Sequence, residues 1–168
     1  MKRFILSLLL LAAPLTAFAD VVLFAGNVAQ ADIPAEYRHF LEEQGKTLVV
    51  SPAKGPRIEM RFTFNSLRSY VKQRPTVGKD FVIDSSKKKG RRTFEVPENG
   101  GVGFVDFSQV GEYDGEKVQE THGIMGLDDG YVTFTVSIPE AEAASPAAKQ
   151  ALESDFKLIL GRIRSRAP

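Results

Sequence analysis

The chain contains two histidines, His39 and His122, and these are its only imidazole side chains. Neither has a second histidine four residues away, which is the spacing that lets one helix face bind zinc. A zinc centre would need both histidines and a carboxylate brought together by the fold. We therefore expect ordinary surface or edge histidines, no metal site and no cofactor.

A hydrolytic site is a second interpretation of His122, because Asp106 or Asp114 could orient its ring beside a nucleophile. The chain carries no G-x-S-x-G elbow, the turn that presents a serine nucleophile in many hydrolases. A triad is recognised by its geometry, which a sequence does not contain. The sequence thus predicts no catalytic residue and leaves open a site assembled around His122 by folding.

Three turns carry residues that also occur in ligand-binding loops. Asp128-Asp129-Gly130 and Asp114-Gly115 place carboxylates beside glycine, but they lack the D-x-D-x-D-G spacing and the Glu at position twelve of a calcium loop. The glycine-rich segment 99–103 precedes a predicted strand, so no helix N-terminus is present there to bind phosphate. All three are predicted to be turns.

One local concentration of charge stands out, with five cations within six positions. These residues, called the basic patch below, are Lys87, Lys88, Lys89, Arg91 and Arg92. They could contact an anionic lipid surface or an acidic partner. Alternatively, they are cations at a helix C-terminus, where the helix dipole favours positive charge. The basic patch is the binding site that the sequence predicts.

Composition excludes several classes of function. The 22 Lys+Arg and 21 Asp+Glu nearly balance, so the chain has no electrostatic footprint for nucleic acid. It has no cysteine, which excludes disulfides, thiol catalysis and thiolate metal sites. Stability must therefore come from packing of its apolar residues.

The first residues have the three parts of a secretory signal peptide. Lys2 and Arg3 precede an apolar run over residues 4–13, and Ala17-Phe18-Ala19 supplies the small residues of a cleavage site. The run is shorter than the roughly 20 residues that span a bilayer. We expect cleavage between Ala19 and Asp20, a periplasmic or secreted protein with no stable membrane span, and a single domain over residues 20–168.

The elements that must position these residues are predicted from hydrophobic periodicity. Apolar and polar residues alternate over residues 57–64, which predicts a strand with one buried and one solvent-exposed face. Further strands are expected at 21–24 and 48–50, and short helices at 34–44 and from Asn65, as its cap, to Gln73. A longer helix is predicted over 78–89, with Asp80 near its start and the lysines of the basic patch near its end.

The second half predicts a meander and a terminal helix. Strands are expected at about 91–96, 102–109, 116–125 and 130–138, separated by Asn-Gly and Asp-Gly turns. Ser145 and Pro146 begin a long helix with one apolar stripe. The stripe comprises Leu152, Phe156, Ile159, Leu160 and Ile163. The predicted fold class is α+β, an antiparallel sheet of about six to seven strands with helices packed on it.

This order of elements resembles the Mog1/PsbP-like superfamily. The resemblance is carried by the Gly78-x-Asp80-Phe81 helix start, the following meander, the Val132-x-Phe134-x-Val136 strand and the terminal amphipathic helix. It covers roughly residues 20–165 as a layout, and its matching residues are structural. The resemblance implies binding or accessory work and provides no catalytic residues to carry over.

Three functions follow as hypotheses. The first is an exported, non-enzymatic accessory protein that binds a protein partner or an anionic envelope surface. The second is a periplasmic immunity protein that neutralises a secreted toxic effector, because a specific inhibitor needs only a complementary surface. The third is an envelope hydrolase whose site forms only in three dimensions.

Overall fold

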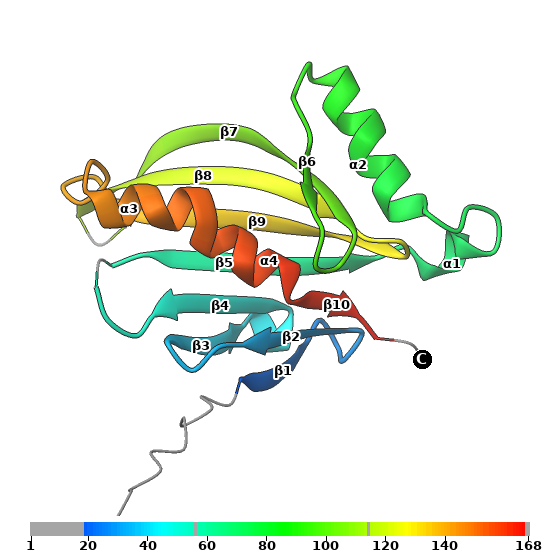
Figure 1. Ribbon diagram of the computed structural model, residues 1–168, viewed down its shortest axis with the longest axis horizontal. Coiled ribbons are helices and arrows are strands. Elements are labelled where there is room, and N and C mark those ends of the chain that lie inside the picture. Colours follow the sequence, from blue (N-terminus) through cyan, green and yellow to red (C-terminus); the bar gives the residue numbers. More distant parts are fainter. Residues whose placement is uncertain (1–18, 56, 114, 167–168) are drawn as a thin grey trace, which may run out of the picture.

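The computed structural model describes residues 19–55, 57–113 and 115–166, so most of the predicted signal peptide lies outside the described residues. Two antiparallel sheets form the fold (Figure 1). The small sheet has the order β1-β2-β10, with β1 at Asp20–Phe24, β2 at Ala29–Ile33 and β10 at Ile163–Ser165. The large sheet has seven strands in the order β3-β4-β5-β9-β8-β7-β6. Its strands are β3 (Tyr37–Glu42), β4 (Thr47–Pro52), β5 (Glu59–Ser66), β6 (Phe94–Val96), β7 (Gly101–Tyr113), β8 (Glu116–Gly126) and β9 (Gly130–Pro139). The α+β prediction is confirmed.

Helices account for the remaining regular structure. α1 (Arg68–Val71) and α2 (Val77–Lys88) connect β5 to β6. The C-terminal helix comprises α3 (Pro146–Gln150), a π-helical stretch (Ala151–Asp155) and α4 (Phe156–Gly161). The Ser145 hydroxyl accepts a hydrogen bond from the Ala148 backbone N–H at 3.1 Å, as an N-cap residue does. This confirms both the helix and its cap, although Ile163 of the predicted stripe lies on β10.

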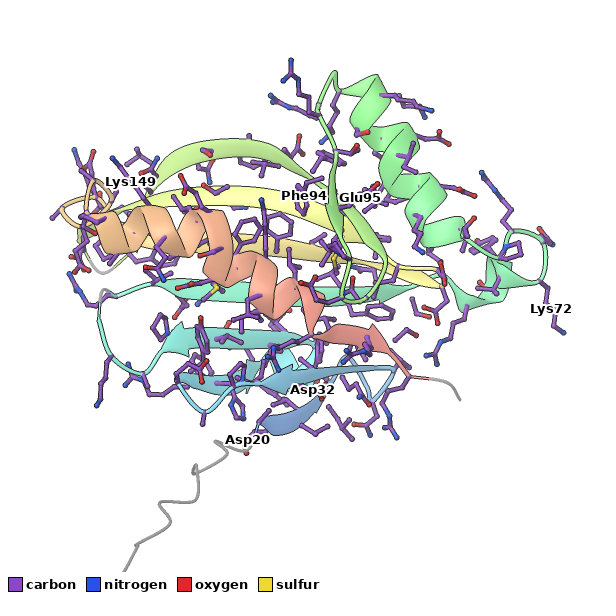
Figure 2. All side chains as sticks on the ribbon, viewed as in Figure 1. Asp20, Asp32, Lys72, Phe94, Glu95 and Lys149 are labelled. Carbon is purple, nitrogen blue, oxygen red and sulfur yellow. The ribbon has the colours of Figure 1, made fainter. Side chains whose placement is uncertain are left out.

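The core lies on one face of the large sheet. Alternate residues of the central strand β9, from Val132 to Ile138, point into it and are at most 2% exposed. The small sheet and the C-terminal helix cover this face (Figure 1). Phe94 extends from β6 toward the helix (Figure 2) and meets the ring of Phe156 edge-on, with centroids 6.2 Å apart. The sequence stripe therefore packs on the sheet as predicted.

The opposite face of the large sheet is only partly covered. α2 packs against β7, β8 and β9 at one end of it. Gly78 allows this close approach, because a Cβ there would lie 1.9 Å from the Gly130 carbonyl oxygen. Gly90, with φ 63°, ends the helix as predicted. The part of this surface that α2 leaves uncovered is called the open face below.

Two local predictions were wrong. Residues 34–44 form β3 and a 3₁₀ turn (Glu43–Gly45) instead of a helix. Tyr37–Glu42 pairs along its whole length with β4, and this pairing outweighs a short helical periodicity. Asn65 does not cap α1, because it lies within β5 and its side-chain amide donates to the Thr63 carbonyl at 3.4 Å. Strand β2 was not predicted.

Candidate binding site on the open face

The open face is built by strand alternation. Side chains at every second position of β5, β9, β8 and β7 point away from the core, and the register aligns them in rows across the strands. One row runs from edge to edge of the large sheet. It comprises Phe40, Val49, Arg61, Thr135, His122 and Phe107. Beside it lies a shorter row of Glu59, Ser137, Glu120 and Gln109.

Both ends of the long row are exposed aromatic rings. Phe40 is 50% exposed on β3, and Phe107 is 44% exposed on β7. The Phe107 ring stacks on the His122 imidazole, with centroids 4.5 Å apart and planes at 21°. Tyr113 adds a third ring, 53% exposed, at the end of β7. Aromatic side chains supply large contact area at low entropic cost, which suits them to binding surfaces.

Glu120 is the centre of a hydrogen-bond network on this face. Its side chain is only 7% exposed, and its Oε2 lies 2.8 Å from Gln109 Nε2 and 3.2 Å from His122 Nε2. Burial alone raises the pKa of Glu120, but the hydrogen bonds from Gln109 and His122 lower it, and the net pKa is below the usual 4.5. The charge of Glu120, together with burial, raises the pKa of Tyr113. The carboxylate is thus held ionised inside the face.

A second network fixes Arg61 beside this centre. Its Nε and Nη2 lie 3.3 Å from the two carboxylate oxygens of Glu42, and its Nη1 lies 2.6 Å from Glu59 Oε1. Each of these side chains is about one-third exposed. A guanidinium held between a carboxylate of its own strand and one from β3, two strands away, has one fixed orientation. The charged side chains of the face are therefore ordered before any partner arrives.

Two hollows open onto this surface. One, of about 390 Å³, lies between α2 and the sheet and is lined by Phe81, Lys89, Phe104, Asp106, His122 and Thr135. The other, of about 380 Å³, lies at the far end beside the loops and includes Lys54, Arg61, Tyr113, Glu116 and Ser137. The Ser137 hydroxyl is buried and, within the described residues, has no hydrogen-bond partner. An unsatisfied buried hydroxyl leaves one donor available at the second hollow.

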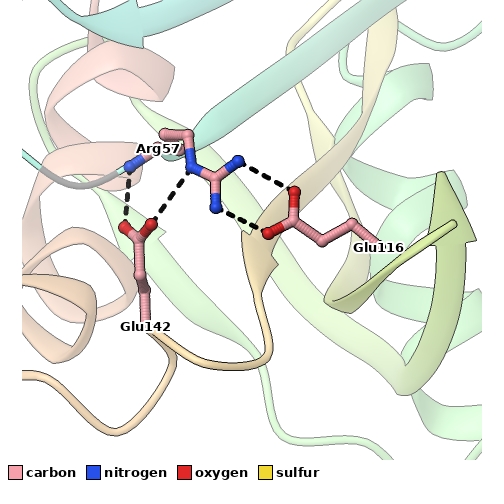
Figure 3. A network of polar contacts seen from close by, with 3 residues as sticks. All are labelled: Arg57, Glu116 and Glu142. Atoms are coloured by element: carbon pink, nitrogen blue, oxygen red, sulfur yellow. Dashed lines mark hydrogen bonds and ion pairs between the residues drawn. The ribbon is translucent and has the colours of Figure 1, made fainter. Parts of the chain in front are cut away.

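Arg57 and Glu116 in the lining of this second hollow belong to an arginine clamp, which Figure 3 shows with Glu142. Arg57 Nη1 and Nη2 lie 2.8 and 2.6 Å from the Glu116 carboxylate oxygens. Its Nε and backbone N–H donate to Glu142 at 3.1 and 2.9 Å. The backbone hydrogen bond from Arg57, followed by the side-chain bond, lowers the pKa of Glu142. The clamp joins the segment before β5, the start of β8 and the loop after β9.

The structure places the basic patch at the C-terminal end of α2. Lys89 pairs with Asp106 of β7, whereas the other four cations make no ion pair with any residue in the described part of the chain. All five are exposed. Their position fits the dipole interpretation and also leaves four charges free for a partner. The structure does not bring the patch into either row of the open face.

The other sequence candidates have structural partners. Asp128 pairs with Lys79 at 2.7 Å and Asp129 with Arg68 at 2.9 Å. Both carboxylates of this turn thus have partners within the protein. Asp106 pairs with Lys89 and does not orient His122, and Asp114 lies outside the described residues. His39 lies on β3, away from His122. In the part of the chain that the structure describes, no three His, Cys, Asp or Glu side chains could hold a metal ion together.

Sequence reasoning missed the acid that accompanies His122. The partner is Glu120, two residues earlier on the same strand, and the hydroxyl of Thr135 on β9 lies 3.1 Å from His122 Nδ1. The i, i+2 spacing of Glu120 and His122 on a predicted strand was the available signal, since such residues share a face. Thr135 and Gln109 come from neighbouring strands, and only the sheet register reveals them.

A pH experiment tests the Glu120 network. Because the folded pKa of Glu120 is lowered, its contribution to stability is present above the unfolded value of about 4.5 and is lost as pH falls through the folded value. We expect Glu120→Gln to be less stable than the wild type at pH 7, with a gap that narrows on acidification. Urea denaturation between pH 3 and pH 7 measures this. Glu95→Gln replaces an exposed residue of β6, and its stability difference from the wild type should not change with pH in this way. A stability difference between Glu120→Gln and the wild type that stays constant with pH would contradict the network.

No family model matches the chain, and no curated protein matches it in sequence. Among solved structures, it is similar to a protein from Bacteroides thetaiotaomicron VPI-5482, with 11% identity and a TM-score of 0.59 over 90% of this chain. The chain spans about half the length of that protein, of which 49% is covered. It also matches cyanobacterial PsbP from Synechocystis sp. PCC 6803, with 10% identity and a TM-score of 0.36, over 89% of this chain and 94% of that one. The first likeness concerns the fold alone, and the second supports no further conclusion.

Among residues 19–55, 57–113 and 115–166, no helix has both the length and the apolar character needed to cross a bilayer.

Proposed function

We propose that the chain is an exported, non-enzymatic binding protein whose protein partner docks on the open face. The observation that carries this proposal is the edge-to-edge row that begins and ends in exposed Phe40 and Phe107. Exposed rings around ordered charges resemble the aromatic anchors and fixed polar groups of protein interfaces. Periplasmic or secreted location, after cleavage between Ala19 and Asp20, is part of the same proposal.

The preorganised charges favour recognition over catalysis. Arg61 pairs with Glu42 and Glu59, and Glu120 Oε2 is within hydrogen-bond distance of Gln109 and His122. Ordered side chains have already lost their conformational freedom, so a partner that contacts them incurs a smaller entropic cost. An accessory role and an immunity role both use such a surface. The partner's identity separates them, since an immunity protein binds a toxic effector.

Site-specific photo-crosslinking in cells tests the proposal. A photoreactive amino acid is placed at Phe40, at Phe107 or, as a control, at Val21, which is 63% exposed on β1 of the small sheet. We expect the same discrete crosslinked species from both open-face positions and none from Val21. Mass spectrometry of that species then identifies the partner.

The crosslinks test which surface binds the partner, and the mass of the chain tests whether it is exported and cleaved. Crosslinks from Val21 alone would place the partner on the small sheet and contradict the open face as the docking surface. Periplasmic extract provides the material, and the intact mass of the purified chain should correspond to a start at Asp20. Retention of Met1 would contradict export with cleavage.

A second candidate function is supported by one observation, the line of Thr135 Oγ1, His122 and Glu120. In the tautomer in which Nε2–H donates to Glu120, Nδ1 accepts the Thr135 hydroxyl proton. This hydroxyl–imidazole–carboxylate series matches the chemistry of an activated nucleophile. Thr135 lies mid-strand, however, paired with β5 and β8, so the neighbouring backbone N–H groups lie in the sheet and do not form an oxyanion hole. An acylating probe that labels Thr135 in the wild type and not in His122→Ala would favour the hydrolase.

Membership of the Mog1/PsbP-like superfamily is also a proposal. It is supported by the order of α2 beginning near Gly78, the β7–β8–β9 meander and the C-terminal helix. That superfamily includes accessory binding proteins, so membership would be consistent with a binding role for this chain.

A further inference from the structure

Strand β7 has a long free edge. It extends from Gly101 to Tyr113, but β6 pairs only with Gly101–Gly103. Along Asp106–Tyr113, no strand in the described part of the chain pairs with its outer side, whereas β8 pairs with the inner side of Phe107–Tyr113. Unpaired N–H and C=O groups on an edge strand form a template for another strand. In Figure 1, β7 arches along the border of the sheet beyond β6.

Exposed apolar side chains lie on both faces of the sheet along this edge, among the polar side chains of Asp106, Ser108, Gln109 and Glu112. Phe107 and Tyr113 point to the open face and Val110 to the other side, with exposures of 44%, 53% and 60%. Edge strands in soluble proteins are usually protected by lysine, proline or a bulge. Here the register shift between Val105 and Phe107 lies at the start of the free edge and the charged residue Glu112 near its end, but no lysine or proline follows in β7. The edge thus keeps its capacity for strand pairing.

The basic patch lies next to the start of this edge. Lys89, at the C-terminal end of α2, contacts Asp106, the first residue of the free edge. Four further cations flank that contact, and they make no ion pair with the described residues. These are Lys87, Lys88, Arg91 and Arg92. A strand added along β7 would therefore have one end beside concentrated positive charge.

The geometry points to β-strand addition, in which an extended segment of the protein partner pairs with Asp106–Tyr113 and places acidic residues at the basic patch. Backbone hydrogen bonds along the edge would provide affinity. Apolar side chains on the added strand would contact Phe107, Val110 and Tyr113, and the acidic end would fix its direction. This inference rests on the proposed binding function and specifies the partner's conformation and charge.

A second copy of the chain fits this edge less well. In a symmetric antiparallel pairing centred on Gln109, Asp106 of each copy lies opposite Glu112 of the other. Like charges directly opposite each other destabilise a strand pair. Such a pair would bring only Glu112 of the other copy to the end of the edge where the basic patch lies, one strand carboxylate for four free cations. The observations therefore favour a different chain with an acidic end.

Synthetic peptides of about ten residues test the inference directly. Each alternates threonine and valine and carries three acidic residues at its N-terminal or its C-terminal end, and a third version has lysines in their place. N-methylation of every second peptide bond prevents the peptides from pairing with one another. We expect one acidic version to bind, and to protect backbone amides of residues 106–113 from hydrogen exchange. Which version binds gives the strand direction.

Charge variants test whether the basic patch itself attracts the acidic peptide, or only the overall charge of the protein. Lys88→Gln/Arg91→Gln/Arg92→Gln should weaken acidic-peptide binding at least tenfold and flatten its salt dependence. The matched control is Lys46→Gln/Lys72→Gln/Lys149→Gln, which removes the same charge from exposed positions elsewhere, two of them labelled in Figure 2. The control should bind as the wild type does. Both triple variants should melt as the wild type does, since exposed charges contribute little to stability.

Proline variants test the edge itself. Neighbouring N–H groups of a strand point in opposite directions, so only one of Val110→Pro and Gly111→Pro loses a bond to β8. The variant that keeps its melting temperature should no longer bind the acidic peptide. Retained binding in that variant, equal binding of acidic and lysine peptides, or binding without amide protection at 106–113 would overturn strand addition. If crosslinks from Phe40 and Phe107 persist in that case, the binding function stands and only its mode is wrong.

Discussion

Phe156→Ala is expected to lower the free energy of unfolding by about 3–5 kcal/mol, the cost of deleting a buried aromatic ring. Phe156 is 5% exposed, and its ring centroid lies 5.4 Å from that of Phe134 and 6.2 Å from that of Phe94. These three rings join the C-terminal helix to β9 and β6. Urea denaturation of the chain from Asp20 onward measures the change, which is comparable to a large part of a domain's total stability.

Leu158→Ala provides the control for Phe156→Ala. Leu158 is on the same helix but 37% exposed, so its truncation leaves a smaller cavity and should cost much less. Equal effects of the two substitutions would show that the Phe156 ring is not part of the core and that the helix packs loosely on the sheet.

Gly78→Ala is expected to destabilise the protein by about 3 kcal/mol, at the upper end of what an overpacked site costs. The new Cβ would lie 1.9 Å from the Gly130 carbonyl oxygen and 2.3 Å from that of Leu127. Both atoms are backbone, so α2 must move away from the sheet. In an exposed helix the same change would stabilise by roughly 1 kcal/mol, and the sign of the effect therefore tests the contact.

Gly111→Ala is the matched control for Gly78→Ala. A Cβ at Gly111 would make ordinary contacts, of 3.4 Å and longer, with side-chain atoms of Glu120 and Val118. Thermal unfolding of both variants, with circular dichroism to follow the helices, should show a large loss for Gly78→Ala and little change for Gly111→Ala. An unchanged melting temperature in Gly78→Ala would mean that α2 does not rest on the β8–β9 turn.

The fold was predictable where a pattern was long and local. The alternation over 57–64 and 130–138 gave β5 and β9, and the stripe around Phe156 gave the C-terminal helix, because each element buries one continuous face. The segment 34–44 was misjudged, since its strand conformation depends on pairing with β4, which comes later in the chain. Strand β2 was missed for the same reason, because it pairs with β10 from the other end of the chain.

The candidate site was predictable only in part. His122 was singled out as a residue around which a site could form, and the structure does build a network there. Its members Gln109 and Thr135 come from two other strands, and Arg61 of the second network comes from a third. No spacing in a sequence encodes which strands become neighbours. The basic patch was visible because it is a continuous run, and its function stays a prediction.

The small sheet also constrains when this protein can fold. Its middle strand, β2, holds β1 on one side and β10 on the other, so residues from the first and last parts of the chain share one ladder. Ser165 is tied further by hydrogen bonds with Arg68 and Asp129, at 2.8 and 2.5 Å. Because a chain is synthesised from its N-terminus, this ladder stays incomplete until Ile163–Ser165 have been made. β1 and β2 can pair early, whereas β10 can join them only after the strands of the large sheet have been synthesised.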